Sequence, residues 1–481
     1  MLRDRVFSGI KWQVGISVFQ KVLSFGTTII LARFLGPSMY GLFALALIVV
    51  SSFELFKCIG IDAALIRKQD NFEIAANTAF IIIPFLGIFL YFILNSLASF
   101  IGKFLNNTDI IPILKILSLI FVISSFTRVP AVILERNMRF KEVSIAEFYA
   151  AVSFSVSALI FILLKFNVWA LVYAYIIKTA VYMILIWSYV RWIPRFQFDR
   201  KVALEMFNFG KFIFLTYALL FIKMNLDNLL VGKLLGITML GLYSIAFNIA
   251  NFCSDYFGNK VNRVFYPAYS KLGNNPQSLS SAFMKTLKFT SIVAFLFGAG
   301  VLVIGPEFLK LLYGDKWDGA TTVLKIMAFA GIFNTLPAGI TALFLSLGKP
   351  RIGFYLMLIE LSIFCIFIPP MANLWGINGV GIIISASSFL SFCIALIMAM
   401  RILSLDIRKI YLTFKPALFS SIVMLGIMLL IKRLMFFYSQ THIMMKYNFI
   451  ILFPLALGVY LITLYKIDKS TLKDFKEIIF K

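Results

Sequence analysis

The sequence has few of the residues that build metal, redox or hydrolytic centres. It contains one histidine, four cysteines and 21 acidic residues in 481 positions. His442 lies in a predicted outer loop, where a solvated side chain is expected, and the cysteines stand singly within apolar stretches: Cys58, Cys253, Cys365 and Cys393. Metal and disulfide centres need these residues in clusters or in Cys-x-x-Cys spacing. We therefore predict no metal, no cofactor and no redox role.

Long polar segments are also missing. Hydrophobic residues make up 61% of the chain, charged residues 14%, and the mean hydropathy is +0.95, whereas soluble proteins are roughly 45–50% apolar. About fourteen apolar stretches approach the roughly 20 residues that a helix needs to cross a bilayer. The connections between them are too short for a soluble catalytic domain. The sequence thus predicts an all-α, polytopic membrane protein and argues against an enzyme.

Negative charge is scarce as well, with 45 Lys and Arg giving a formal net charge of +24. In a soluble protein this excess would suggest nucleic acid as a partner. Here the cations concentrate in the N-terminal tail and in alternate loops, for example at Arg136, Arg139 and Lys141, as expected of cytoplasmic segments that face anionic lipids. We predict an inner-membrane protein with both termini cytoplasmic, membrane lipids as partners and no nucleic acid. Arg3–Arg5 precede the first span directly, so no cleavable signal peptide is expected.

One phrase of the sequence occurs twice. Leu31–Leu42 (LARFLGPSMYGL) returns as Val231–Leu242 (VGKLLGITMLGL), and a shorter phrase at Ile113–Leu117 returns at Val323–Met327. An even number of predicted spans separates the copies, so the halves are parallel repeats, which place a substrate path between them. We predict two pseudo-symmetric six-helix bundles, residues 1–200 and 201–405, and two additional helices with a tail, residues 406–481.

Polar residues recur at helical spacing within two spans. The first span has Gln13, Ser17, Gln20, Ser24 and Thr27, and the eighth has Asn248, Asn251, Asp255, Asn259 and Asn262. Steps of three and four residues keep each set on one helical face. Single Ser, Thr and Asn side chains often only bond helices together, but two long stripes favour a solvated cavity. We predict that Gln13, Gln20, Asn248 and Asn251 contact the substrate.

The predicted spans also contain cations, which cost about 2.5–3.5 kcal/mol near a helix centre in a membrane. They are Lys21, Lys57, Lys115, Arg128, Lys178, Lys223 and Lys325. A lysine near a helix end can reach the interface cheaply, and this is the interpretation for Lys115, Lys178 and Lys325.

Three lysines lie deeper in their predicted spans and have two explanations. Glu54 precedes Lys57 by three residues and Lys223 precedes Asp227 by four, so charge-neutralising pairs are one explanation. The other is an anion site formed by Lys21, Lys57 and Lys223, because lysine binds phosphate as a point charge. Acidic residues available for ion coupling are Glu54, Asp62, Asp227 and Asp255.

Several phrases resemble a known family. Besides Leu31–Leu42 they are Ala64–Asp70 (ALIRKQD), Val168–Val172 (VWALV), Leu226–Ile249 and Tyr313–Met327. The chain resembles the polysaccharide transporter family of the multidrug, oligosaccharidyl-lipid and polysaccharide flippase superfamily, in the branch of the colanic-acid and teichuronic-acid exporters. The resemblance implies a flippase that moves a polyprenyl-pyrophosphate-linked oligosaccharide outward by alternating access, alongside a polysaccharide polymerase and glycosyltransferases. It does not imply which glycan is carried.

Two other functions fit the same hydropathy. A cation-coupled drug exporter of the superfamily would need dominant intramembrane carboxylates, whereas cations dominate here. A polysaccharide polymerase-type enzyme would need a large outer loop with catalytic groups, and the outer loops predicted here are short.

Overall fold

The structure is a computed structural model made only of helices and connecting turns in the part of the chain that it describes. It describes the backbone of residues 2–68, 70–272, 275–438 and 442–469, and the side chains there except those of 2–18, 21, 259, 436–438 and 442–450. The all-α fold predicted from the sequence is confirmed. Eleven helical segments among the described residues are long and apolar enough to cross a membrane. The count of fourteen spans stays a prediction.

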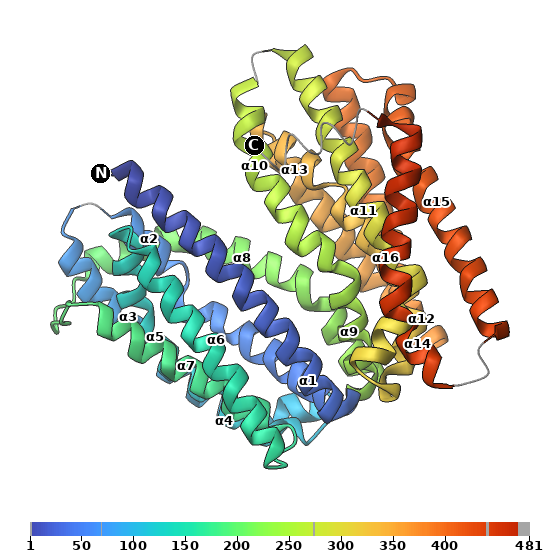
Figure 1. The fold of residues 1–481 in the computed structure, drawn as a ribbon. Coiled ribbons are helices and arrows are strands. Elements are labelled where there is room, and N and C mark those ends of the chain that lie inside the picture. The colour runs from blue at the N-terminus through green and yellow to red at the C-terminus, as the bar shows by residue number, and fades with distance from the viewer. Residues whose placement is uncertain (1, 69, 273–274, 439–441, 470–481) are drawn as a thin grey trace. The chain divides into compact units, whose positions relative to one another are not determined.

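The chain divides into two compact units, Met1–Gly241 and Leu242–Lys481. The helices of the first unit are α1 (Leu2–Cys58), α2 (Ile61–Arg67), α3 (Phe72–Phe104), α4 (Ile110–Leu117), α5 (Leu119–Arg136), α6 (Phe140–Leu163), α7 (Trp169–Tyr189) and α8 (Arg200–Leu235) (Figure 1). Helix α9 (Ile237–Cys253) begins in this unit and continues into the second.

The second unit continues from α9 through a π-helix at Ser254–Gly258. Its further helices are α10 (Asn259–Leu272), α11 (Pro276–Leu312), a 3-10 turn at Asp315–Ala320, α12 (Thr321–Thr335), α13 (Ala338–Ser346), α14 (Pro350–Leu403), α15 (Ile407–Tyr438) and α16 (His442–Ile467). The predicted division at residues 200 and 405 stays a prediction. In the structure α8 packs against α1, α2 and α3, and α15 and α16 both pack against α11.

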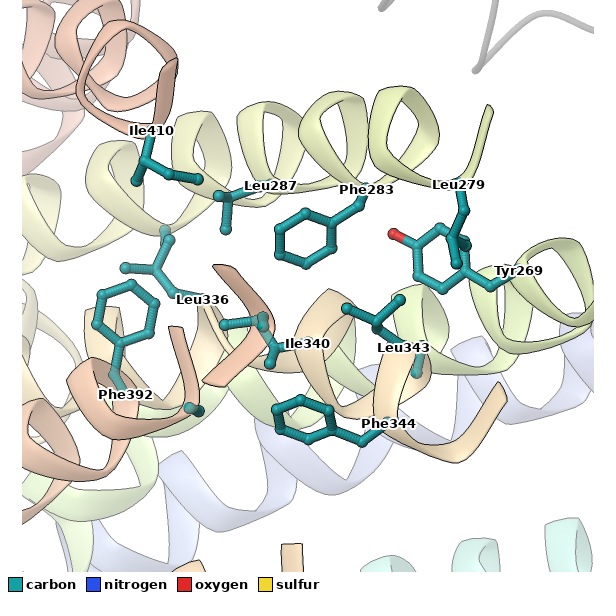
Figure 2. Packing of buried hydrophobic residues seen from close by; sticks show 14 of the residues in the cluster. Tyr269, Leu279, Phe283, Leu287, Leu336, Ile340, Leu343, Phe344, Phe392 and Ile410 are labelled. Atoms are coloured by element: carbon teal, nitrogen blue, oxygen red, sulfur yellow. The ribbon is translucent and has the colours of Figure 1, made fainter. Parts of the chain in front are cut away.

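A cluster of buried apolar side chains holds the second unit together. Figure 2 shows Leu279, Phe283 and Leu287 of α11 directed toward Ile340 and Leu343 of α13. Burying one such side chain contributes about 1.5–3 kcal/mol. Another buried cluster joins α11 to α15 and α16, where the Tyr460 hydroxyl donates a hydrogen bond to the Ile292 carbonyl at 2.9 Å. The two last helices are therefore packed parts of this unit.

The repeated phrase has the same backbone conformation in both copies. Gly36 has φ 75° and ψ 175°, and Gly236 has φ 87° and ψ 172°, a region that side chains rarely allow and glycine occupies freely. The helix turns sharply at each of these glycines. The second glycine of each copy lies against the backbone of the other copy. A Cβ on Gly41 would lie 1.9 Å from the backbone oxygen of Ile237, and a Cβ on Gly241 would lie 2.0 Å from the backbone oxygen of Pro37.

This reciprocal contact leaves no room for a methyl group. We expect Gly41→Ala and Gly241→Ala each to destabilise the protein by about 1–3 kcal/mol or more, because backbone must move to admit the side chain. Gly426→Ala is the control, since nothing lies within 4 Å of its Cβ position. The midpoint of thermal unfolding in detergent measures the effect, with the fraction of folded monomer as a second readout. Equal midpoints for Gly41→Ala and Gly426→Ala would show that the contact is not tight.

Candidate functional site

The chain breaks out of helix between α1 and α2. Ile59 has φ 44° and Gly60 has φ 72°, and a positive φ at a β-branched residue is a strained exception. Such strain, of about 1–3 kcal/mol, persists where surrounding structure enforces it and is common at functional sites. Helix α8 packs closely against this break and holds its conformation, because a Cβ on Gly60 would lie 2.4 Å from the backbone oxygen of Gly210. The break is therefore held rigidly by backbone contact.

A buried lysine lies just before the break. Lys57 is 7% exposed, and its Nζ donates to Glu54 Oε1 at 3.0 Å and to the Ser124 hydroxyl at 2.6 Å. Ser124 Oγ also lies 3.1 Å from the same Glu54 oxygen. The three groups form a closed triangle that joins α1 to α5. A charge-neutralising pair with Glu54 was one of the two explanations that the sequence left open for Lys57, and this pair is present in the structure.

A second ion pair lies just after the break. Arg128 donates to Asp62 Oδ2 from Nε at 3.0 Å and from Nη2 at 2.6 Å, and Arg128 Nη1 lies 3.6 Å from Glu135 Oε1. Ser124 and Arg128 are one helical turn apart on α5, so this helix bonds to the chain on both sides of the break. The guanidinium and the carboxylate neutralise each other, which reduces the cost of both charges within an apolar bundle.

Helix α7 adds a third cation to the same region. Lys178 lies midway along α7, not near a helix end as expected, with Nζ 5.1 Å from the centre of the Tyr175 ring. It interacts electrostatically with Glu147 and Glu54. The first unit thus brings together Lys57, Arg128 and Lys178, each with a carboxylate in range.

The structure leaves part of the predicted lysine site undescribed. The side chains of Gln13 and Lys21 lie outside the described residues, and Gln20 is partly exposed. Lys223 is also partly exposed, and Asp227, one turn further along α8, is 2% exposed and accepts a hydrogen bond from Asn228 at 3.2 Å.

One member of the polar stripe on the first span bonds two helices together. The Thr27 hydroxyl of α1 is buried and donates to Ser155 of α6 at 2.8 Å. For this residue the role is helix packing, one of the two explanations considered for such stripes.

Residues of the polar stripe of the eighth span differ in burial. Asn248 is exposed, whereas Asn251 is buried and accepts a hydrogen bond from Asn334 Nδ2 at 2.7 Å. Beyond Cys253 the chain enters the π-helix, which shifts the register of the residues that follow, and Asp255 there is exposed. The α-helical spacing used for the stripe therefore does not hold through this segment, and a single stripe stays a prediction.

The two units carry corresponding polar contacts with different charge. By the spacing of the sequence repeats, Ser254 occupies the position of Glu54 and Asn334 that of Ser124. The Ser254 hydroxyl donates to the Asn334 carbonyl at 3.0 Å. The contact that contains an ion pair in the first unit is therefore neutral in the second. Sequence reasoning missed Ser124 and Asn334, although the shorter repeated phrase relates them.

Metal binding finds no support in the described part of the chain, where no group of three or more His, Cys, Asp or Glu side chains could hold an ion. The site offers ammonium, guanidinium, hydroxyl and carboxylate groups instead. Such groups bind and release anions, and protons can move to or from the carboxylates.

Known proteins similar in sequence are named for polysaccharide biosynthesis. A family model described as polysaccharide biosynthesis protein matches residues 30–322. The lipopolysaccharide biosynthesis protein WzxC of Escherichia coli (strain K12) is 24% identical over 359 residues, which are 73% of this chain and 72% of that protein. The teichuronic acid biosynthesis protein TuaB of Bacillus subtilis (strain 168) is 25% identical over 313 residues, 63% of this chain and 65% of that protein.

Solved structures with the same fold are transporters. The lipid II flippase MurJ, in an inward closed conformation, superposes with a TM-score of 0.77 at 13% identity and covers 98% of this chain and 100% of that one. An inward-facing multidrug resistance MATE family transporter of the MOP superfamily gives a TM-score of 0.63 at 15% identity, over 82% of this chain and 98% of that one.

The Asp62–Arg128 pair permits a test of the site's architecture. We expect Arg128→Gln to lower the free energy of unfolding by about 1.5–3 kcal/mol, because Asp62 loses its charged hydrogen bonds. Asp62→Asn combined with Arg128→Gln should recover part of that loss, since Asp62 is then no longer a charge without its partner, although Glu135 still lacks Arg128. Chemical denaturation in detergent measures both.

The control is Lys310→Gln, which breaks an exposed pair with Asp315 at 3.3 Å and should change stability by less than about 1 kcal/mol. A double variant that is no more stable than Arg128→Gln alone would contradict the pairing.

Proposed function

Because the chain belongs to the polysaccharide biosynthesis protein family, we propose that it is a flippase that moves a polyprenyl-pyrophosphate-linked oligosaccharide across the cytoplasmic membrane. Family membership is the observation that carries this proposal. The similarity to WzxC and TuaB, both named for polysaccharide biosynthesis, supports it. The fold shared with a lipid II flippase supports the transport of a lipid-linked cargo in particular.

The cargo's chemistry defines what the protein must supply. The polyprenyl tail can stay in lipid, but the charged pyrophosphate and the sugars need polar partners while they cross. In our proposal Lys57, together with Lys21 and Lys223, binds the pyrophosphate. Gln13, Gln20, Asn248 and Asn251 bind the sugars. The ammonium and hydroxyl of Lys57 and Ser124, 2.6 Å apart, support the first part, since both groups bond to phosphate oxygens.

Membrane potential is a sufficient driving force for this cargo. Each charge that crosses 100 mV gains or loses about 2.3 kcal/mol, so a headgroup with two negative charges moving outward gains about 4–5 kcal/mol. A coupling ion is then not required. If one is used, its carboxylate belongs to the set Glu54, Asp62, Asp227 and Asp255.

An anionic cargo fits this site better than an organic cation. Glu54 and Asp62 bond to Lys57 and Arg128, so a cation would have to compete with both bases. A cation-coupled drug exporter, which shares the fold, would instead need carboxylates that outnumber the bases around its site.

The remaining parts of the proposal concern location and partners. The distribution of Lys and Arg supports cytoplasmic termini. The cargo must be made by glycosyltransferases on the inner side and extended by a polymerase on the outer side, so these enzymes are the expected partners. The protein itself acts as a transporter and not as an enzyme.

Disruption of the gene tests the function. We expect the lipid-linked oligosaccharide to accumulate on the inner side and surface polysaccharide to disappear, because synthesis continues without export. Mass spectrometry of extracted lipids identifies the cargo, and the intact gene restores export as the control. Normal surface polysaccharide together with sensitivity to cationic dyes would instead identify a drug exporter.

A further inference from the structure

In the triangle of Glu54, Lys57 and Ser124, the lysine and the serine are groups that commonly bind phosphate. The Glu54 carboxylate lies where the phosphate would bind. The Lys57 ammonium donates to Glu54 Oε1 at 3.0 Å, and the Ser124 Oγ lies 3.1 Å from the same oxygen and 2.6 Å from the Ile120 carbonyl, to which its proton can also be donated. Lysine and serine bond to a phosphate oxygen in the same way. The carboxylate therefore fills the place that an anionic ligand of Lys57 would take.

The two charged members differ in their freedom to move. The Lys57 side chain is 9% exposed, whereas that of Glu54 is 31% exposed. Lys57 is thus nearly enclosed by its surroundings, whereas about a third of the Glu54 side chain is open to solvent. An arriving anion would displace the carboxylate and leave the lysine in place.

A second anion cannot share Lys57 with an ionised Glu54. At about 5 Å and an effective dielectric constant of about 20, each pair of like charges repels by about 3 kcal/mol. Protonation of Glu54 removes this repulsion. Lys178 of α7 also interacts electrostatically with Glu54, whereas the neighbouring titratable groups Tyr175 and Cys58 are neutral near pH 7.

We propose that Glu54 is an internal competitor of the substrate, and that binding of a diphosphate headgroup at Lys57 and Ser124 is coupled to uptake of one proton by Glu54. This inference rests on the proposed flippase function. The proton comes from water and converts the displaced carboxylate to a neutral acid, with no covalent bond made or broken in the cargo. When the headgroup leaves, Glu54 returns that proton to water and pairs with Lys57 again.

Pairing in the empty state has a clear physical advantage. An uncompensated lysine within a membrane protein would cost several kcal/mol, and Glu54 removes this cost whenever no substrate is bound. The Glu54–Lys57 pair is therefore electrically neutral when no substrate is bound.

In the second unit the contact that corresponds to Glu54–Lys57–Ser124 contains no ionisable side chain. Phe257 occupies the position of Lys57, and Ser254 bonds to the backbone of Asn334 at 3.0 Å. No ionisable group takes part in that bond. Of the two corresponding positions, only that of Glu54 in the first unit therefore has a carboxylate that can compete with the substrate.

The test measures binding of inorganic pyrophosphate to the full-length protein in nanodiscs. Isothermal titration at pH 6 and pH 8, in two buffers that differ in ionisation enthalpy, gives both the affinity and the number of protons taken up. Pyrophosphate itself gains protons in this range, so the coupling is read as the difference between wild type and Glu54→Gln.

Glu54→Gln should bind pyrophosphate about tenfold more tightly at pH 8, which corresponds to about 1.4 kcal/mol, and should take up one proton fewer than wild type. Glu54→Asp, whose shorter side chain weakens the pair, should be intermediate. Lys57→Gln should lose binding at least tenfold. Glu73→Gln, which removes an exposed acid in the first turn of α3, is the matched control and should behave as wild type.

The inference is overturned if Glu54→Gln binds pyrophosphate no more tightly than wild type, or with the same proton uptake. If Glu54→Gln does not fold, Glu54→Asp decides in the same way. Failure of the proposed function would be seen separately, as an unchanged lipid-linked pool after gene disruption. Accumulation of that pool together with unchanged binding by Glu54→Gln would overturn only the coupling.

Discussion

Neutralisation of charge inside an apolar bundle is the constraint that the first unit depends on. Lys57 and Arg128 lie among helices that must bury apolar surface, and each forms an ion pair with a carboxylate a few residues from the break between α1 and α2. A lone charge there would be costly. The Asp62–Arg128 pair also joins α2 to α5, and the hydrogen bond from Lys57 to Ser124 joins α1 to α5. In the proposed function a cargo that carries negative charge binds at Lys57, so that structure and transport would depend on the same group.

The sequence repeat explains how the first unit can have an ionised site that the second unit lacks. Gly36 and Gly236 give both copies the same turn, and Gly41 and Gly241 allow close backbone contact. With this framework duplicated, the residues at other corresponding positions can differ. Glu54 against Ser254 is the clearest difference, since it separates an ionisable contact from a neutral one.

Much of this could be predicted from the sequence, because the signals are local. Apolar stretches of membrane length predicted the helices, the repeated phrase predicted the related turns, and the spacing of three residues offered the Glu54–Lys57 pair as one of two explanations. Contacts between distant segments could not be predicted this way: Asp62 meets Arg128, and Lys57 meets Ser124, only after α5 packs beside the break. The π-helix after Cys253 also has no periodic signal in the sequence, so a prediction based on α-helical spacing could not include its change of register.

The central claim is that the protein moves an anionic lipid headgroup and that the membrane potential, without an ion gradient, is enough to drive it. Reconstitution into proteoliposomes with a polyprenyl-pyrophosphate-linked oligosaccharide, under an imposed potential and without any proton or sodium gradient, tests it most directly. The account predicts that the headgroup moves toward the positive side faster than at zero potential, and that Lys57→Glu abolishes the movement. Movement no faster than in protein-free vesicles would contradict it.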